Sequence, residues 1–220
     1  MSVSGPLYPV GLVVAGRRCL VVGGGHVAAR KIAALVACGA AVTVVAPQVH
    51  EAIGELAATG DLAAVDDVPL DVQLRPYRAG EAAGYRLVVA ATGDEAVDDA
   101  VYRDAEAAGV WVNVADDPAR CTFVLPAVAR RGDVTVAVAT GGTSPALAVW
   151  LRDRIGDDVG PWAGELAALL AEARARVRAR GRSTESVDWR AALDGPLSEL
   201  VRQGRTDEAR AMLQALVDRI

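Results

Sequence analysis

The sequence has few of the residues from which disulfide networks and metal centres are built. It contains only two histidines and three cysteines, namely His26, His50, Cys19, Cys38 and Cys121. The cysteines are far apart and lie within apolar segments, which predicts reduced core thiols rather than a disulfide framework or a zinc cage. Because two histidines leave too few ligands, we expect no structural metal site.

The sequence also lacks an excess of one charge and a long apolar run. Lys and Arg number 23 against 28 Asp and Glu, and the resulting net charge of −5 favours neither nucleic acid nor an anionic membrane as a partner. No basic run precedes an apolar stretch at the N-terminus, and apolar windows such as 20–22 and 87–91 are strand-sized. We therefore expect a cytoplasmic protein that binds neither nucleic acid nor membrane.

What is present is an alternation of apolar runs and helical patterns between Arg18 and Val114. This alternation is typical of a parallel sheet covered by crossover helices. The expected strands are 19–22, 42–46, a weak one near 72–75, 87–91 and 111–114, and the expected helices are 27–38, 51–59 and 95–108. Gly39 and Gly109 follow two of these helices, where a C-terminal cap is expected.

The pattern changes after Val114. Residues 122–129 and 134–139 read as a hairpin joined around 130–133, and the chain becomes helical from Ser144, with breaks near 156–161 and 181–183. In the last helix, Thr206 is the expected cap, and the apolar stripe comprises Ala209, Met212, Leu213, Leu216, Val217 and Ile220. The predicted fold is α/β: an N-terminal Rossmann-type parallel sheet (1–115), a central β segment (116–143) and a small C-terminal helical domain (144–220).

A glycine motif follows the first predicted strand. Gly23-Gly24-Gly25-His26-Val27-Ala28 fits the dinucleotide pattern of glycine, any, glycine, any, any, glycine or alanine. Gly23 permits a tight turn, Gly25 lets the backbone approach a pyrophosphate, and Ala28 allows close packing of helix on strand. A flexible turn is the alternative, but the position between a strand and a helix favours dinucleotide binding.

An expected acidic residue is missing after the second strand. An NAD site usually carries a carboxylate there for the ribose 2′-hydroxyl, whereas this chain has Pro47 and Gln48. Either residue could contact the ribose, or both could simply start a loop. The choice between NAD and NADP therefore stays open on physical grounds.

Two later segments could bind or react with a ligand. Asn113-Val114-Ala115-Asp116-Asp117-Pro118 ends the fifth strand at the edge where open α/β sheets bind ligands, and Asp116 is the candidate acid or base. Asp117 precedes a proline and suits a turn, and all three polar residues could merely stabilise that turn. The segment 140–145 could hold an anion or could cap the helix that follows.

The motifs together resemble those of the precorrin-2 dehydrogenase and sirohydrochlorin ferrochelatase family, which includes the N-terminal module of siroheme synthases. The resemblance spans nearly the whole chain. Its motifs are Leu7–Val10, Val22–Lys31, Val44–Pro47, Val89–Asp94, Val112–Pro118, Phe123–Ala127, Thr140–Pro145 and Leu147–Arg152. This ordered set is far more specific than the glycine motif alone.

The resemblance implies a reaction and a set of site residues. The reaction is the NAD-dependent oxidation of precorrin-2 to sirohydrochlorin, with insertion of a ferrous or cobaltous ion as a further activity of some members. The implied catalytic residue is Asp116, and the NAD-binding residues are expected to be Gly23, Gly24, Gly25, His26, Val27, Pro47, Gln48 and Thr92. A homodimer that pairs through the central β segment is also implied.

The substrate of that reaction carries acetate and propionate arms, which need basic partners. The candidates are Arg120, Arg130, Arg131 and Arg152. Two other functions stay open: an NAD redox sensor without catalysis, and a dehydrogenase of another small substrate. The sensor would need a DNA-reading element with a basic surface, which we do not find. Fold alone does not exclude the second alternative.

Overall fold

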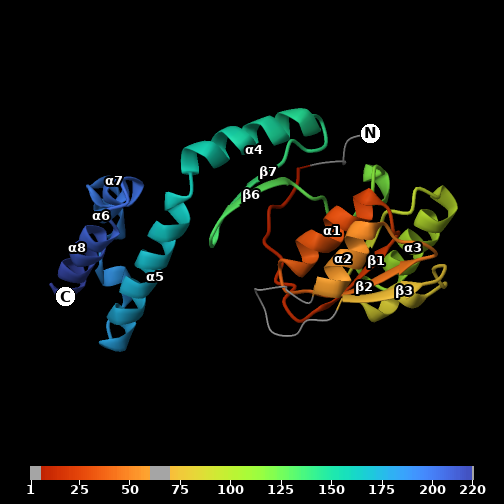
Figure 1. The fold of residues 1–220 in the computed structure, drawn as a ribbon, viewed down its shortest axis with the longest axis horizontal. Coiled ribbons are helices and arrows are strands. Elements are labelled where there is room, and N and C mark those ends of the chain that lie inside the picture. The colour runs from red at the N-terminus through yellow and green to blue at the C-terminus, as the bar shows by residue number, and fades with distance from the viewer. Residues whose placement is uncertain (1–5, 60–69, 220) are drawn as a thin grey trace. The chain divides into compact units, whose positions relative to one another are not determined.

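The computed structural model describes residues 6–59 and 70–219, and its N-terminal part is built on a five-stranded parallel sheet (Figure 1). The strand order is β3-β2-β1-β4-β5. The strands are β1 (Arg18–Val22), β2 (Ala41–Ala46), β3 (Leu70–Leu74), β4 (Leu87–Ala90) and β5 (Trp111–Val114). All five predicted strands are confirmed, including the weak third one.

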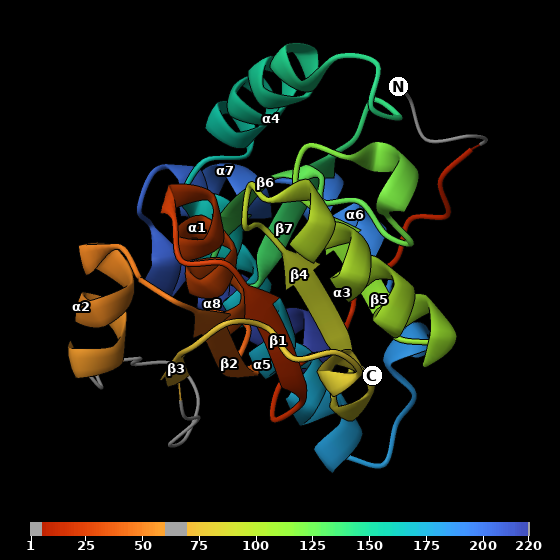
Figure 2. The ribbon, with the colours of Figure 1, turned by 90° about the vertical axis from the view of Figure 1, so that its right-hand side faces the viewer.

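Helices cover both faces of this sheet, so its strands are apolar on both sides. Successive side chains of a strand point to opposite faces. Accordingly Val21 packs into one core with α1 (His26–Val36) and α2 (Glu51–Thr59), and Leu20 packs into a second core with α3 (Glu95–Ala107). Figure 2 shows α1 and α2 on one side of the sheet and α3 on the other.

The turns after these helices confirm the predicted caps. Gly39 and Gly109 have φ values of 73° and 65°, which L residues with a side chain rarely adopt. Two short 3-10 helices complete this part: η1 (Glu81–Gly84) before β4 and η2 (Pro118–Arg120) after β5.

The first strand of the hairpin begins later in the chain than predicted. β6 (Ala127–Arg131) pairs antiparallel with β7 (Val134–Val138), so 122–126 are not part of it and only Gly132 and Asp133 form the turn. Pro126 lacks the N–H that a strand would use. Thr122 instead pairs with the end strand of the parallel sheet, where its N–H donates to the Val112 carbonyl at 2.9 Å.

The helices of the second half start and stop at local signals. They are α4 (Pro145–Val159), α5 (Trp162–Ala179), η3 (Thr184–Ser186), α6 (Trp189–Asp194), α7 (Leu197–Arg202) and α8 (Thr206–Asp218). Ser144 caps α4 by accepting from the Leu147 N–H, and its own N–H donates to the Thr140 hydroxyl. The segment 140–145 thus uses these hydroxyls for capping. The expected break after Gly156 falls at Gly160, where φ is 59°.

The last helix confirms the predicted stripe but not its cap. Ala209, Leu213 and Val217 are buried among α5 and α7, and Met212 and Leu216 pack against them. Ile220 lies outside the described residues. The cap prediction is wrong: Arg205 is the N-cap residue, and the Thr206 hydroxyl donates to the Glu165 carboxylate of α5.

The chain divides into two compact units, Met1–Leu125 with Gly141–Thr143 and Pro126–Thr140 with Ser144–Ile220. The predicted three-domain boundaries stay a prediction. None of the three cysteines forms a disulfide, and burial raises the pKa of the Cys19 thiol to about 11. No helix in the described part of the chain is long and apolar enough to cross a membrane.

Candidate active site

The glycine motif forms the turn between β1 and α1, at the carboxyl edge of the sheet. Gly23 has a φ of 123°, and a Cβ there would lie 2.2 Å from the Ala91 carbonyl oxygen. A Cβ on Gly24 would lie 1.9 Å from the Gln48 carbonyl oxygen. Both contacts are with backbone, so the loop is held between the segments that follow β2 and β4.

Gly25 is the glycine with free space. A Cβ there would meet nothing within 4 Å, and the residue is the N-cap of α1 without a side-chain hydrogen bond. The first N–H groups of a helix lack partners within the helix and attract anions. Gly25 therefore combines room and donors at the place where a dinucleotide would put its pyrophosphate.

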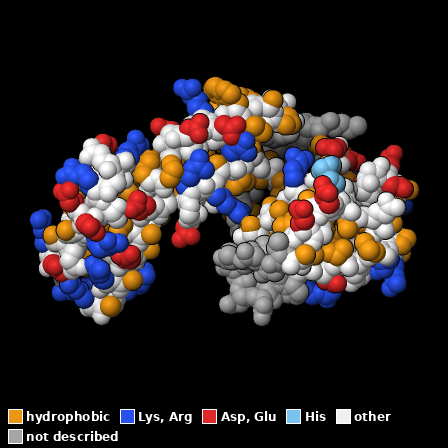
Figure 3. Space-filling model, viewed as in Figure 1, with side chains coloured by type: hydrophobic (Ala, Val, Ile, Leu, Met, Phe, Trp, Pro, Cys, Tyr) orange, Lys and Arg blue, Asp and Glu red, His pale blue; other side chains and the backbone are white. Residues whose placement is uncertain are grey.

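His26 and Val27 open α1 on different sides. Val27 lines a cleft, described below, whereas the exposed His26 ring lies 3.8 Å from the His50 ring between centroids. The histidine pair is visible on the surface in Figure 3. The His50 N–H also donates to the Gly24 carbonyl at 2.7 Å, so a residue not predicted for the site braces the glycine loop.

Pro47 and Gln48 are exposed at the end of β2. Gln48 contacts the glycine loop through its backbone, as its carbonyl lies against Gly24. No carboxylate follows β2 directly. The structure thus brings the predicted residues of the β1 and β2 loops together at one edge.

Thr92 lies after β4, in the loop that packs against Gly23. Its hydroxyl donates to the buried Asp98 carboxylate at 2.7 Å, and its N–H donates to the same oxygen at 3.3 Å. Asp94 caps α3 by accepting from the Ala96 and Val97 N–H groups. Asp98 was not predicted for the site. The available signal in the sequence was an Asp inside a predicted helix, six residues after Thr92.

We predict that Asp98→Ala lowers the free energy of unfolding by about 1–3 kcal/mol, because two donors of Thr92 lose a buried acceptor. Urea denaturation measures this. Glu106→Ala, an exposed change on the same helix, is the control and is expected to stay within about 0.5 kcal/mol of the parent. Equal stabilities of the two variants would contradict the role of Asp98.

A cleft of about 300 Å³ lies at this edge of the sheet. Its lining comes from α1, the β4–α3 segment and the end of β5: Val27, Ala91, Gly93, Glu95, Asp98, Val114, Ala115, Asp116, Asp117 and Arg120. The strand order reverses between β1 and β4, because β2 lies on one side of β1 and β5 lies beyond β4. Open α/β sheets bind ligands at such a switch point.

Asp116 lies in this cleft with an unusual backbone. Its φ is 61°, and no other non-glycine residue in the described chain has a positive φ. The left-handed conformation costs a non-glycine residue about 1 kcal/mol or more, and such strain concentrates at functional sites. The side chain is exposed, and no hydrogen bond to its carboxylate comes from residues 6–59 or 70–219.

The neighbours of Asp116 have structural roles. The buried Asn113 amide donates to the Phe123 carbonyl at 3.1 Å, and the Asp117 carboxylate accepts from the Ala119 N–H at 3.1 Å as the cap of η2. Turn stabilisation therefore explains Asn113 and Asp117. In the described part of the chain, the Asp116 side chain makes no comparable hydrogen bond that would stabilise the turn.

Arg120 lines the cleft, and Lys31 lies close enough to Asp116 for their charges to interact. Arg120 pairs with Glu95, Asp99 and Asp117, and the bond to Glu95 is the main cause that raises the pKa of Arg120. Lys31 lies on α1 one turn after Val27 and is half-buried. Burial lowers the pKa of Lys31, and the nearby Asp116 carboxylate opposes this effect. Lys31 was not predicted for the site.

The other candidate arginines are not in this cleft. Arg130, Arg131 and Arg152 line a second, polar hollow of about 280 Å³ formed by β6 and α4. Basic side chains gather beside the hairpin in the space-filling view (Figure 3). The Arg131 guanidinium donates to the Arg130 and Gly156 carbonyls, and Arg152 pairs with Asp153 at 2.6 Å.

Three family models match the chain. One described as "Putative NAD(P)-binding" matches residues 10–127, one described as "Sirohaem biosynthesis protein central" matches 131–157, and one described as "Sirohaem synthase dimerisation region" matches 163–217. The dimerisation region therefore falls on the helices from α5 to α8, whereas the family resemblance implied pairing through residues 116–143.

Curated relatives include two siroheme synthases. The protein of Methylococcus capsulatus is 40% identical over 213 residues, which are 96% of this chain and 43% of that protein. The protein of Nitrosococcus oceani is 39% identical over 212 residues, 96% of this chain and 44% of its own length. The chain thus spans less than half the length of these relatives.

A solved structure is similar over nearly the whole of this chain. The chain named "SirC, precorrin-2 dehydrogenase" superposes with a TM-score of 0.72 and 26% identity, covering 95% of this chain and 100% of that one. The similarity extends from the parallel sheet to the C-terminal helices, which confirms the predicted fold class.

Proposed function

The chain belongs to the precorrin-2 dehydrogenase family that includes the N-terminal module of siroheme synthases, and from this premise we propose that it oxidises precorrin-2 to sirohydrochlorin with NAD. One observation carries the proposal: Val27, which directly follows the glycine loop and His26, lines a single cleft together with Asp116. A nicotinamide held by the loop would lie within reach of the carboxylate.

The residues present fit a dinucleotide. Gly25 offers open space at the N-terminus of α1, and Gly23 and Gly24 hold that terminus against the β2 and β4 loops. Thr92, whose hydroxyl donates to Asp98, lies between Ala91 and Gly93, which line the cleft at the same edge. When bound, the nicotinamide supplies the acceptor for a hydride.

In the proposed mechanism, Asp116 handles the proton. Removal of two hydrogens from the substrate releases a hydride and a proton, and the Asp116 carboxylate accepts the proton and passes it to solvent. An exposed carboxylate to which no residue in the described part of the chain donates a hydrogen bond is free to do so. Its strained backbone directs the side chain from the end of β5 into the cleft.

We further propose that Lys31 positions an anion in the cleft. It lies one turn beyond Val27, its charge interacts with Asp116, and no hydrogen bond or ion pair occupies its ammonium group within the described chain. A half-buried cation without a fixed partner suits a carboxylate arm of the substrate.

We predict that Lys31→Met lowers kcat/KM for precorrin-2 by about 10-fold or more, the equivalent of one charge-assisted hydrogen bond. Lys31→Arg is expected to restore activity. Because burial lowers the pKa of Lys31, its charge is lost at a lower pH than that of a free lysine, so the arginine variant should keep activity further into alkaline pH. Identical pH profiles for parent and Arg variant would contradict this role.

The first test of the proposed function is anaerobic turnover of precorrin-2 with NAD or NADP, followed by the absorbance of sirohydrochlorin. Formation that depends on NAD supports the dehydrogenase. Absence of oxidation with either cofactor, despite confirmed NAD binding, would overturn it and favour a redox sensor or another substrate. Ferrous or cobaltous ions added to the product then test the metal insertion implied by the family resemblance.

We also propose that the chain forms a homodimer. The match of residues 163–217 to a dimerisation region supports this. Analytical ultracentrifugation of the full chain tests it, and a monomer at micromolar concentration would contradict it.

A further inference from the structure

We propose that His50 is a further positioning residue for the dinucleotide, which acts by holding the His26 ring beside the glycine loop, at the expected place of the pyrophosphate. The inference rests on the proposed function and deepens it, because it concerns the same cofactor. His26 is among the predicted cofactor residues, whereas His50 is not. The chain has no other histidine.

His50 joins the segment after β2 to the start of α1. Its backbone N–H donates to the Gly24 carbonyl at 2.7 Å. Its ring lies 3.8 Å from the His26 ring between centroids, with an angle of 46° between the ring planes. His26 directly follows Gly25, the N-cap residue of α1, so the ring contact reaches the helix turn where the pyrophosphate is expected.

The His50 ring is itself held by the first turn of α2. Its Nδ1 accepts from the Ala52 N–H at 3.2 Å, and the His50 carbonyl accepts from the Ile53 N–H at 2.9 Å. His50 is half-buried, whereas His26 is exposed. The half-buried ring is therefore a fixed surface against which the exposed ring packs.

This contact should raise the affinity for the cofactor. A side chain that is free before binding loses rotamer freedom when a ligand contacts it, which lowers affinity by about 2–10-fold. The His26 ring makes no hydrogen bond or ion pair with the described part of the chain, and its contact with the His50 ring restricts it. A pyrophosphate at Gly25 would thus meet a histidine that is already in place.

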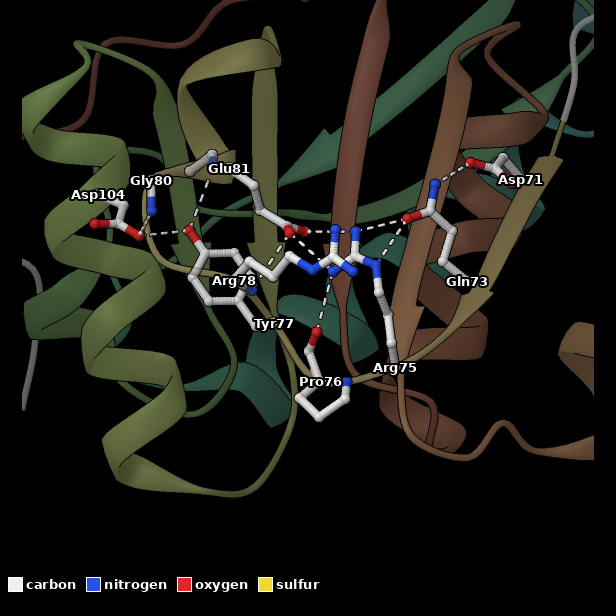
Figure 4. Close-up of polar contacts among 10 residues, drawn as sticks. Asp71, Gln73, Arg75, Pro76, Tyr77, Arg78, Gly80, Glu81 and Asp104 are labelled. Atoms are coloured by element: carbon white, nitrogen blue, oxygen red, sulfur yellow. Dashed lines mark hydrogen bonds and ion pairs between the residues drawn. The ribbon is translucent and has the colours of Figure 1, made fainter.

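The nearest arginine beyond β2 is committed elsewhere. The Arg75 N–H donates at 3.0 Å to the carbonyl of Ala46, the last residue of β2. Its guanidinium, however, pairs with Glu81, with Nη1 2.8 Å from Oε2, and donates to Gln73 (Figure 4). The Arg75 and Glu81 side chains are only 22% and 16% exposed. This pair therefore offers no free donor, and the histidine pair is the side-chain contact that reaches the glycine loop.

The test is the binding of NAD and of ADP-ribose to the full chain by isothermal titration calorimetry. ADP-ribose has the pyrophosphate but lacks the nicotinamide. In His50→Asn, the new side chain can still cap α2, and the bond to Gly24 stays because the backbone makes it. We expect both affinities to fall about 3–10-fold. The KM for NAD should rise by the same factor while kcat stays within about 2-fold, and the midpoint of thermal unfolding should stay within about 2 °C of the parent.

Two further variants separate the ring contact from the cap. His50→Phe keeps an aromatic ring against His26 but loses the Nδ1 acceptor, so it should keep the affinities and lower the unfolding midpoint. In a chain that already carries His26→Ala, His50→Asn should cause no additional loss of affinity, because the ring contact is already absent.

Unchanged affinities in His50→Asn, or additive losses in the double variant, would overturn the inference. So would a loss for NAD that ADP-ribose does not share, since the effect would then lie at the nicotinamide. His50→Ser, whose hydroxyl also caps helices, gives the same comparison if the asparagine variant does not fold. If the parent chain binds neither ligand, the proposed function itself fails, and that failure is read on the parent chain alone.

Discussion

Replacing Asp116 with asparagine is expected to lower the turnover of precorrin-2 by about 10²–10⁴-fold, the usual contribution of a general base. Asparagine also tolerates the left-handed conformation that Asp116 adopts at φ 61°, so the fold should not change. NAD affinity is expected to stay within about 2-fold of the parent, because the predicted cofactor contacts lie on other residues. Steady-state kinetics and calorimetry measure the two quantities.

A second substitution at this position separates chemistry from stability. Asp116→Gly should remove both the backbone strain and the carboxylate. Relief of strain stabilises the folded state, whereas the greater freedom of glycine stabilises the unfolded chain. Because these effects oppose each other, we expect the free energy of unfolding to change by no more than about 1 kcal/mol. Turnover should still be lost. Asp117→Asn is the control, because it changes a neighbouring carboxylate that caps η2. Asparagine also serves as an N-cap, so a much smaller loss of turnover is expected. Normal turnover by Asp116→Asn would refute the assignment.

Replacing Gly24 with alanine is expected to weaken NAD binding by about 10–100-fold and to destabilise the first unit by about 1–3 kcal/mol, the cost of inserting a methyl group into packed structure. The reason is steric. The added Cβ would lie 1.9 Å from the Gln48 carbonyl oxygen and 3.0 Å from the Ala46 Cβ. The backbone of Gly24 or Gln48 must therefore move, and Gly24 is part of the glycine loop that is predicted to bind the cofactor. Calorimetry and urea denaturation give the two changes.

Gly25→Ala provides the matched comparison. Its Cβ would meet no atom beyond its chain neighbours within 4 Å, and alanine is a somewhat poorer N-cap residue than glycine, so stability should fall by less than about 1 kcal/mol. The close approach of a pyrophosphate would also be hindered, so NAD affinity should fall while stability changes little. Gly54→Ala, exposed in α2 with open space around it, should affect neither binding nor folding adversely. If Gly25→Ala binds NAD as tightly as the parent, the predicted pyrophosphate position is wrong.

Local patterns explain why so much of the first unit was predictable. Strands buried on both faces read as short apolar runs, and glycines with positive φ mark the ends of α1 and α3. The glycine motif and the polar residues after β5 are likewise contiguous in sequence. Their meeting at one cleft follows from parallel strands, whose carboxyl ends share an edge.

The failures have a common physical cause. The sequence predicts the first hairpin strand too early, because a single apolar pattern cannot distinguish pairing with β7 from pairing with β5, where the Val112 carbonyl accepts from the Thr122 N–H. The sequence predicts Thr206 as a cap because its hydroxyl suits one, yet that hydroxyl donates to Glu165, 41 positions away. In both cases a distant partner decided between two locally acceptable structures.

The sequence by itself determined the order of strands and helices, the dinucleotide loop and the candidate Asp116, because periodicity, turn chemistry and short motifs act over a few residues. Only the tertiary structure decided that Gly24 rather than Gly25 is the tightly packed glycine, that Asp98 holds Thr92, that Lys31 lies near enough to Asp116 for their charges to interact and that Glu81 pairs with Arg75. These are contacts between segments that become neighbours when the sheet forms. Distance in space, which no local pattern encodes, sets their energies.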